Sequence, residues 1–168
     1  NLPVPNIPYS FIESKLGVSA AVWDIYRSEL ARIESGGDYT KIGGGGDRYD
    51  GRYQIGKSAK KGGARAIGIE NPGHDKQQRA QFRDNPELQE QILAGLTVGN
   101  HNILTKTTWT DKYEQIEDPI ERIKILAYAH NQGYENAAKW LETGASSVDG
   151  FGTDGTEFYN AVAAALSS

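Results

Sequence analysis

The sequence contains no cysteine and no methionine among its 168 residues. The absence of cysteine excludes a disulfide scaffold, a thiolate zinc site and a cysteine nucleophile. No stretch approaches the ~18 consecutive apolar residues that span a membrane, so we expect no membrane insertion. The histidines His74, His101 and His130 lack the short spacing of metal ligands, and we predict neither a metal site nor another cofactor.

Basic residues are also in deficit. Lysine and arginine number 18 against 22 aspartates and glutamates, which gives a net charge of −4. Proteins that bind nucleic acid usually present a basic face, so nucleic acid is not expected as the main partner. Hydrophobic residues make up 38% of the chain, enough for the core of one globular domain. The chain begins at Asn1 without an initiator methionine, as expected of a processed protein or a domain of a longer one.

Proline and glycine divide the chain into segments. Prolines at positions 3, 5 and 8 predict an extended start, and we assign residues 1–16 to an N-terminal arm and 17–168 to a single domain. The spacing of apolar residues predicts helices over about 19–33, 57–67, 86–107, 118–132, 137–141 and 158–166. The glycine-rich stretch 35–56 predicts a loop or short hairpin, and 143–156 a flexible loop. The fold class is therefore mainly α with one small glycine-rich region.

Glu34 stands at the predicted end of a helix, directly before Ser35-Gly36-Gly37. A carboxyl group at the negative end of the helix macrodipole is suited to hold a proton and to donate it to a leaving oxygen. The glycines that follow allow the backbone to approach an extended ligand closely. The alternative interpretation is that Glu34 is an ordinary solvated carboxylate beside a helix cap.

The segment from Glu34 to Gly56 resembles the active-site stretch of goose-type lysozymes and soluble lytic transglycosylases. The matches are Glu34-Ser35, Gly46-Asp47-Arg48 and Gly51-Arg52-Tyr53-Gln54, in the family's order. A later segment, Ala129-His130-Asn131-Gln132-Gly133, stands where this family has Ala-Tyr-Asn-Ala-Gly. The resemblance implies an α+β lysozyme-like fold with a helical lobe, a small glycine-rich lobe containing at most a short hairpin, and a cleft between them.

The resemblance also implies a reaction. It is cleavage of the β-1,4 bond between N-acetylmuramic acid and N-acetylglucosamine in peptidoglycan, with Glu34 as the general acid. Asp47 would be the base that activates water in a hydrolase; without it, the hydroxyl of muramic acid attacks and the enzyme is a lytic transglycosylase. Residues implied to bind substrate are Ser35, Tyr53, Gln54, His130 and Asn131. Tyr39 and Tyr49 are further candidates for stacking on sugar rings.

Two positions depart from the family pattern. His130 replaces a tyrosine, and Gly56 stands where goose-type enzymes carry a second aspartate. Asp38 and Asp50 are alternatives to Asp47 that the pattern does not match. The His-Asn-Gln-Gly variant is similar to that of phage-encoded wall-degrading enzymes. The resemblance therefore implies peptidoglycan strands as partner, an extracellular, periplasmic or virion-associated location, and a larger virion or wall assembly as a candidate context.

Two other functions compete with this interpretation. Gly51–Ser58 matches the pattern of a P-loop, but the preceding residues GGGGDRYD cannot form the buried strand that a P-loop requires. A lysozyme-like fold without activity, serving as a wall-binding or structural virion module, is the second alternative. The basic residues near this motif, Lys57, Lys60, Lys61 and Arg65, are expected to form a solvated helix face.

Overall fold

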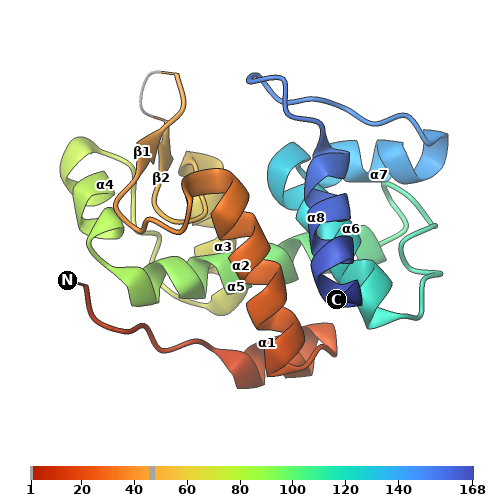
Figure 1. Ribbon diagram of the computed structural model, residues 1–168, viewed down its shortest axis with the longest axis horizontal. Coiled ribbons are helices and arrows are strands. Elements are labelled where there is room, and N and C mark those ends of the chain that lie inside the picture. Colours follow the sequence, from red (N-terminus) through yellow and green to blue (C-terminus); the bar gives the residue numbers. More distant parts are fainter. Residues whose placement is uncertain (1, 46–47) are drawn as a thin grey trace. The chain divides into compact units, whose positions relative to one another are not determined.

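Helices dominate the structure, and one small antiparallel hairpin interrupts them (Figure 1). The computed structural model describes residues 2–45 and 48–168, so the predicted base Asp47 lies outside the described residues. The helices are α1 (Tyr9–Leu16), α2 (Ala20–Ser35), α3 (Lys57–Ile67), α4 (Lys76–Arg83), α5 (Pro86–Thr105), α6 (Pro119–Gln132), α7 (Tyr134–Thr143) and α8 (Gly155–Ser167). The strands β1 (Ile42–Gly43) and β2 (Tyr49–Asp50) pair Ile42 with Asp50 and Gly43 with Tyr49. The mainly α class and the short hairpin are confirmed.

Local capping signals fix the helix boundaries that the sequence predicts. The Ser19 hydroxyl accepts a hydrogen bond from the backbone N–H of Val22 at 3.2 Å, and α2 begins at the next residue. At its end, Gly36 and Gly37 adopt φ angles of 67° and 91°, which turn the chain out of the helix. Asp118 caps α6 in the same way, accepting from the N–H of Ile120 at 2.9 Å.

Two helices lie where none is predicted. Helix α1 occupies half of the predicted arm, because Ile12 and Leu16 recur at helical spacing and are both buried. Residues 2–8 lie outside any helix or strand. Helix α4 begins at a capping box in which Asp75 and Gln78 each accept a hydrogen bond from the other's backbone N–H. The pattern Asp-x-x-Gln is visible in the sequence, but α4 buries only Phe82, so apolar periodicity does not reveal it.

The chain divides into two units, each described by itself. The first comprises the residues up to Phe11 with Ala31–Gly99, and the second comprises Ile12–Leu30 with Asn100–Ser168. Within the second unit, α6 is the central helix, with a buried run from Ile125 to Ala129. Helix α8 packs along it, and the Trp140 ring of α7 stacks on Tyr128 with 4.3 Å between centroids (Figure 1).

Within the first unit, α3 and α5 cross with their backbones in contact. A Cβ atom at Gly63 would lie 2.7 Å from the Ile92 carbonyl oxygen, and one at Gly95 would lie 2.0 Å from the Gly63 carbonyl oxygen. Because any larger residue at either position would force the helices apart, this crossing requires glycine on both helices.

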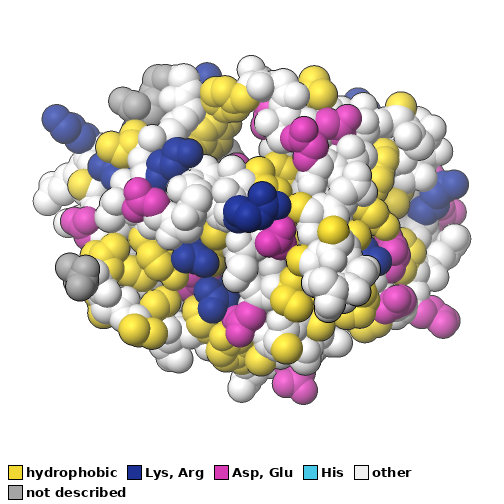
Figure 2. All heavy atoms as spheres, in the orientation of Figure 1, with side chains coloured by type: hydrophobic (Ala, Val, Ile, Leu, Met, Phe, Trp, Pro, Cys, Tyr) yellow, Lys and Arg dark blue, Asp and Glu magenta, His cyan; other side chains and the backbone are white. Residues whose placement is uncertain are grey.

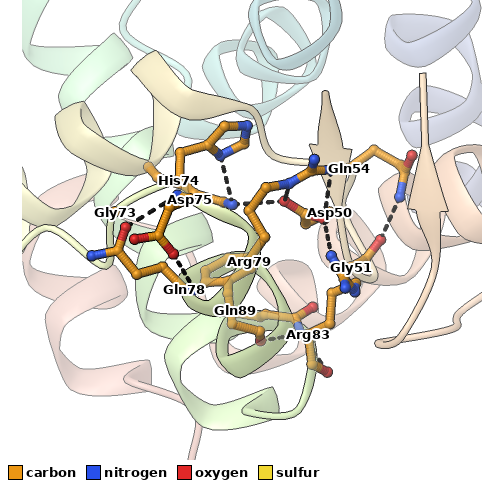
Figure 3. A network of polar contacts seen from close by, with 12 residues as sticks. Asp50, Gly51, Gln54, Gly73, His74, Asp75, Gln78, Arg79, Arg83 and Gln89 are labelled. Atoms are coloured by element: carbon orange, nitrogen blue, oxygen red, sulfur yellow. Dashed lines mark hydrogen bonds and ion pairs between the residues drawn. The ribbon is translucent and has the colours of Figure 1, made fainter. Parts of the chain in front are cut away.

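A buried ion cluster joins the hairpin to α3 and α4 (Figure 3). The Asp50 carboxylate has no exposed side-chain surface and accepts from Lys60 Nζ at 2.8 Å, Arg79 Nε at 2.8 Å and Arg83 Nη1 at 2.6 Å. Lys60 is also fully buried, so its assignment to a solvated face is wrong. Its ammonium group donates to His74 Nδ1 at 3.0 Å and lies 4.5 Å from the Phe82 ring centroid.

Charge in this cluster sets the protonation states. Burial by itself raises the pKa of Asp50, but hydrogen bonds from Arg79, Lys60 and Arg83 outweigh it and lower the pKa to about 2. An ammonium group can only donate, so His74 Nδ1 is an acceptor. Burial, followed by the charge of Lys60, lowers the pKa of His74, which keeps the imidazole neutral.

Two further observations concern the helices and the charged side chains at the surface. Among the described residues, no helix combines the length and the apolar character needed to cross a membrane. On the face drawn in Figure 2, side chains of lysine and arginine occur together with those of aspartate and glutamate.

We predict that the Asp50 cluster makes the protein sensitive to acid. The folded pKa of Asp50 lies below its value of 3.8 in an unfolded chain, so its contribution is present above about pH 4 and is lost as the pH falls toward 2. The contribution amounts to about 2 kcal/mol of unfolding free energy. Urea unfolding of the wild type between pH 6 and pH 2.5 measures it.

The matched variants are Asp50→Asn and, as control, Asp111→Asn at an exposed position. Asp50→Asn is expected to be less stable at pH 6 by about 3 kcal/mol, because it leaves buried cations without their carboxylate. It should also lose less stability than the wild type on acidification. Equal pH profiles for Asp50→Asn and the wild type would contradict this account.

Candidate functional site

The predicted acid, Glu34, lies in the last turn of α2 and is half-buried. Its backbone carbonyl accepts a hydrogen bond from Lys41 Nζ at 3.0 Å, which ties the helix end to the start of the hairpin. The carboxyl group belongs to the last turn of α2, whose C-terminal end is the negative pole of the helix dipole. The chain then leaves the helix at Gly36 and Gly37, which both have a positive φ.

Ser35 fastens this turn to the loop that follows β2. Its hydroxyl donates to the Arg52 carbonyl oxygen at 2.7 Å and accepts from the backbone N–H groups of Gly37 and Asp38 at 3.1 and 3.0 Å. The contact with Arg52 spans 17 residues of sequence. The two segments that the resemblance groups together, Glu34-Ser35 and Gly51–Gln54, are therefore directly bonded. The same bonds occupy the hydroxyl that we predicted to bind substrate.

Glu90 on α5 is the buried centre of this region, and sequence reasoning missed it. Its carboxylate has no exposed side-chain surface. It accepts from the hydroxyl of Tyr53 at 2.6 Å and from that of Tyr39 at 2.7 Å, and Arg52 Nε lies 4.0 Å away. The available signal was a carboxylate beside Ile92 and Leu93 on the apolar face of a helix, where a charge must be paired.

Arg52 connects the Glu90 network to the turn that follows the predicted acid. Its guanidinium lies 5.1 Å from the Tyr39 ring centroid and 5.7 Å from that of Tyr53, and Nη1 donates to the Gly37 carbonyl at 3.3 Å. Its backbone N–H donates to Gln89 Oε1 at 2.9 Å. Through Arg52, the turn at Gly37 is therefore bonded to α5.

This arrangement changes the role of the predicted tyrosines. Tyr53 is fully buried, and its ring and hydroxyl belong to the Glu90 network; its contact with a substrate stays a prediction. The Tyr39 hydroxyl is also bound to Glu90, and its ring is half-buried under Arg52. Tyr49 on β2 is 36% exposed and stays a prediction as a stacking residue.

Gln54 has an unusual backbone. Its φ angle is 50°, and among the described residues no other residue except glycine has a positive φ. Nε2 donates to the Gly51 carbonyl at 2.9 Å, and the amide covers Gly43, where a Cβ atom would come within 1.8 Å of Gln54 Oε1. Left-handed backbone costs a residue other than glycine about 1 kcal/mol, and such strain is often found at functional sites. Gln54 is half-buried and stays a candidate ligand residue.

The two aspartates considered as alternative bases differ in their surroundings. Asp50 is enclosed by three cations and has no exposed surface, so it cannot hold a water for attack. Asp38 is exposed and accepts from the Thr40 N–H and hydroxyl, both at 2.8 Å. Those two bonds lower the pKa of Asp38, which keeps it ionised. Asp38 therefore remains the described alternative to Asp47.

The segment Ala129–Gly133 belongs to the second unit, at the C-terminal end of α6. Asn131 Nδ2 donates to Asp149 Oδ2 at 3.0 Å, and Gln132 Nε2 donates to Asn131 Oδ1 at 2.5 Å. His130 is half-buried, and its ring centroid lies 6.3 Å from that of Phe158. The Asn131 amide thus holds the loop after α7 to the end of α6.

No family model, curated protein or solved structure matches this chain. The assignment of the site therefore depends on its residues and geometry. Among the residues that the structure describes, no group of histidine and carboxylate side chains is placed to hold a metal ion. The chemistry available at the end of α2 is that of a carboxylic acid, amides and hydroxyls.

The P-loop interpretation does not fit the geometry. A P-loop cradles phosphate with free backbone N–H groups, but here the N–H of Gly51 donates to Lys41 O and that of Arg52 to Gln89 Oε1. Those of Gln54 and Ile55 donate to Gly51 O and Asp50 O. The strand before the motif has two residues, of which Tyr49 is exposed. These backbone N–H groups are occupied by bonds within the protein, so they cannot cradle a phosphate.

We predict that removing one hydroxyl from the Glu90 network destabilises the protein. Tyr53→Phe removes one of the donors to the buried Glu90 carboxylate, which keeps its bond from Tyr39, and should reduce the unfolding free energy by about 1–3 kcal/mol. The control, Tyr49→Phe, removes an exposed hydroxyl and should change it by less than about 0.5 kcal/mol. Chemical denaturation measures both, and similar losses in the two variants would contradict the role of Glu90.

A second prediction concerns the backbone of Gln54. Gln54→Gly and Gln54→Ala both remove the bond to the Gly51 carbonyl, but only glycine adopts a φ of 50° without strain. Gln54→Gly should therefore be more stable than Gln54→Ala by about 1 kcal/mol. If Gln54 binds substrate, both variants lose activity to a similar degree. Activity that follows stability across the pair would assign Gln54 a structural role only.

Proposed function

We propose that the protein is a muramidase that cleaves the glycan strands of peptidoglycan, with Glu34 as the general acid. The observation that carries the proposal is the 2.7 Å hydrogen bond from Ser35 to the Arg52 carbonyl. It joins the Glu-Ser and Gly-x-x-Gln segments, whose resemblance to goose-type lysozymes and lytic transglycosylases suggested the reaction. A cleft between a helical and a glycine-rich lobe, as the resemblance implies, forms part of the proposal.

The reaction would begin with proton transfer. Glu34 donates its proton to the glycosidic oxygen while the bond from that oxygen to C1 of muramic acid breaks, and positive charge develops on the sugar ring. The ionised Glu34 then remains near the oxocarbenium-like sugar. Its place at the end of α2, on a turn fixed by Ser35 and Arg52, supports this role because an acid must be held within hydrogen-bonding reach of the oxygen.

The second half of the reaction has two versions. In the hydrolytic version, Asp47 takes a proton from a water that attacks C1, and the product has a reducing muramic acid end. In the alternative version, the muramic acid's own hydroxyl attacks C1 and gives its proton to the ionised Glu34, and an anhydro sugar results, as in lytic transglycosylases. The Gly46-Asp47-Arg48 match favours hydrolysis. The two versions share Glu34 and differ in the product end.

We predict that Glu34→Gln abolishes peptidoglycan digestion with the fold intact. An amide cannot donate the required proton, and the rate should fall by at least about 10²-fold. The measurement is a digest of purified peptidoglycan with products separated by liquid chromatography and identified by mass spectrometry. Circular dichroism checks the fold, and Glu70→Gln, at an exposed position of the same unit, is the control.

Each result of this digest has a definite meaning. Reducing ends that disappear in Asp47→Asn support the hydrolase, whereas anhydro ends from the wild type support the transglycosylase. Digestion by Glu34→Gln at the wild-type rate would refute the assignment of the acid. A wild type that binds peptidoglycan without releasing fragments would identify a non-catalytic wall-binding module.

A further inference from the structure

The loop between α7 and α8 presents its apolar side chains outward. Within Ser146–Asp154, which we call the capping loop, Val148 is 61% exposed and Phe151 is 65% exposed. The remaining side chains of this loop are small or polar. Apolar side chains normally gather inward, and a large exposed aromatic beside a second exposed apolar residue is a mark of a contact surface.

This loop is held by a dense set of hydrogen bonds. The Asp149 carboxylate accepts from the N–H groups of Phe151 and Thr153 at 2.8 and 2.9 Å, and its own N–H donates to the Thr153 carbonyl at 2.9 Å. Val148 and Asp154 form an isolated antiparallel bridge. Burial alone raises the pKa of Asp149, but these bonds and one from Asn131 lower it, so the carboxylate stays ionised and bonded. The expectation of a flexible loop here is not supported by this bonding.

The capping loop is also anchored to the end of α6. Ser147 Oγ donates to Gln132 Oε1 at 2.9 Å, and the Ser147 N–H donates to the Tyr128 hydroxyl at 2.9 Å. Asp149 accepts from Asn131 at 3.0 Å. The polar side chains thus face the segment that the resemblance links to substrate, and the exposed Phe151 is fixed next to that segment within one unit.

The charged residues around the capping loop limit the kind of partner that the loop can bind. Residues 140–168 contain the four acidic residues Glu142, Asp149, Asp154 and Glu157, and no lysine or arginine. This stretch therefore offers no cationic side chain to an anionic partner such as an acidic lipid headgroup. A neutral ligand with its own apolar patches fits better, and an N-acetylated sugar ring has such patches in its C–H face and its acetamido methyl group.

We propose that Phe151 and Val148 form a binding surface for a neutral N-acetylated sugar of the glycan strand. Phe151 stacks on the sugar face, and Val148 contacts the acetamido methyl group. The Asp149 hydrogen bonds hold both residues in place before the strand arrives, which reduces the entropy lost on binding. This inference rests on the proposed function and adds a substrate contact that the resemblance does not supply.

The experiment measures binding without catalysis. In the Glu34→Gln protein, Phe151→Ala should weaken co-sedimentation with purified peptidoglycan about tenfold, which corresponds to ~1.4 kcal/mol. Val148→Ala should weaken it less. Asp149→Asn retains Phe151 but loosens the loop, and it should also weaken binding. Trp109→Ala, which removes a 44% exposed aromatic side chain of the same unit, is the matched control and should leave binding unchanged.

Several results would overturn the inference. If Phe151→Ala and Asp149→Asn bind as the Glu34→Gln parent does, the loop is not a glycan surface, and the proposed function stands. Binding of the parent to phosphatidylglycerol vesicles that is lost in Phe151→Ala would assign the loop to a lipid surface instead. A parent that binds no peptidoglycan overturns this inference, and a wild-type digest then decides whether the proposed function fails with it.

Discussion

The glycine-rich stretch between α2 and α3 buries few apolar side chains, Tyr53 and Ile55 among them, and buried carboxylates supply most of its specific contacts. Asp50 forms ion pairs with three cationic side chains of α3 and α4, and Glu90 on α5 accepts hydrogen bonds from two tyrosine hydroxyls. A buried carboxylate is costly unless every lone pair is occupied, so each of these groups demands a fixed set of donors. The positions of Tyr39, Asp50 and Tyr53 follow from satisfying them.

The same constraint shapes the candidate site. Glu34 itself belongs to a regular helix, but the turn after it is placed by Ser35 and Arg52, and Arg52 is placed by Tyr39, Tyr53 and Glu90. Under the proposed function, the acid would therefore be positioned through Arg52 by the buried network around Glu90. Such support is what a catalytic acid requires, because an error of a fraction of an ångström in its position lowers the rate.

Features of the fold and the site that depend on contacts between residues close in sequence could be predicted, whereas those that depend on distant contacts could not. Ser19, Gly36 and Asp118 mark helix ends through bonds to residues two to four positions away, and those boundaries are confirmed. Lys60 was misjudged because its helix carries other lysines, although its spacing to Gly63 and Ala64 places it on the buried face. Its partner Asp50 is ten residues away on a strand, and no periodicity within α3 reveals it. Glu90 was missed for the same reason, since its partners are 37 and 51 residues away.

The burial of Lys60 has a practical consequence for chemical labelling. Lys57 and Lys61 lie on the same helix and are exposed, whereas the Lys60 ammonium group is enclosed by Asp50, His74 and the Phe82 ring. An amine-directed acylating reagent therefore meets three lysines in one short peptide that differ only in access. Acylation of Lys57 and Lys61 reports the surface, and acylation of Lys60 reports the fraction of molecules in which the hairpin has separated from α3.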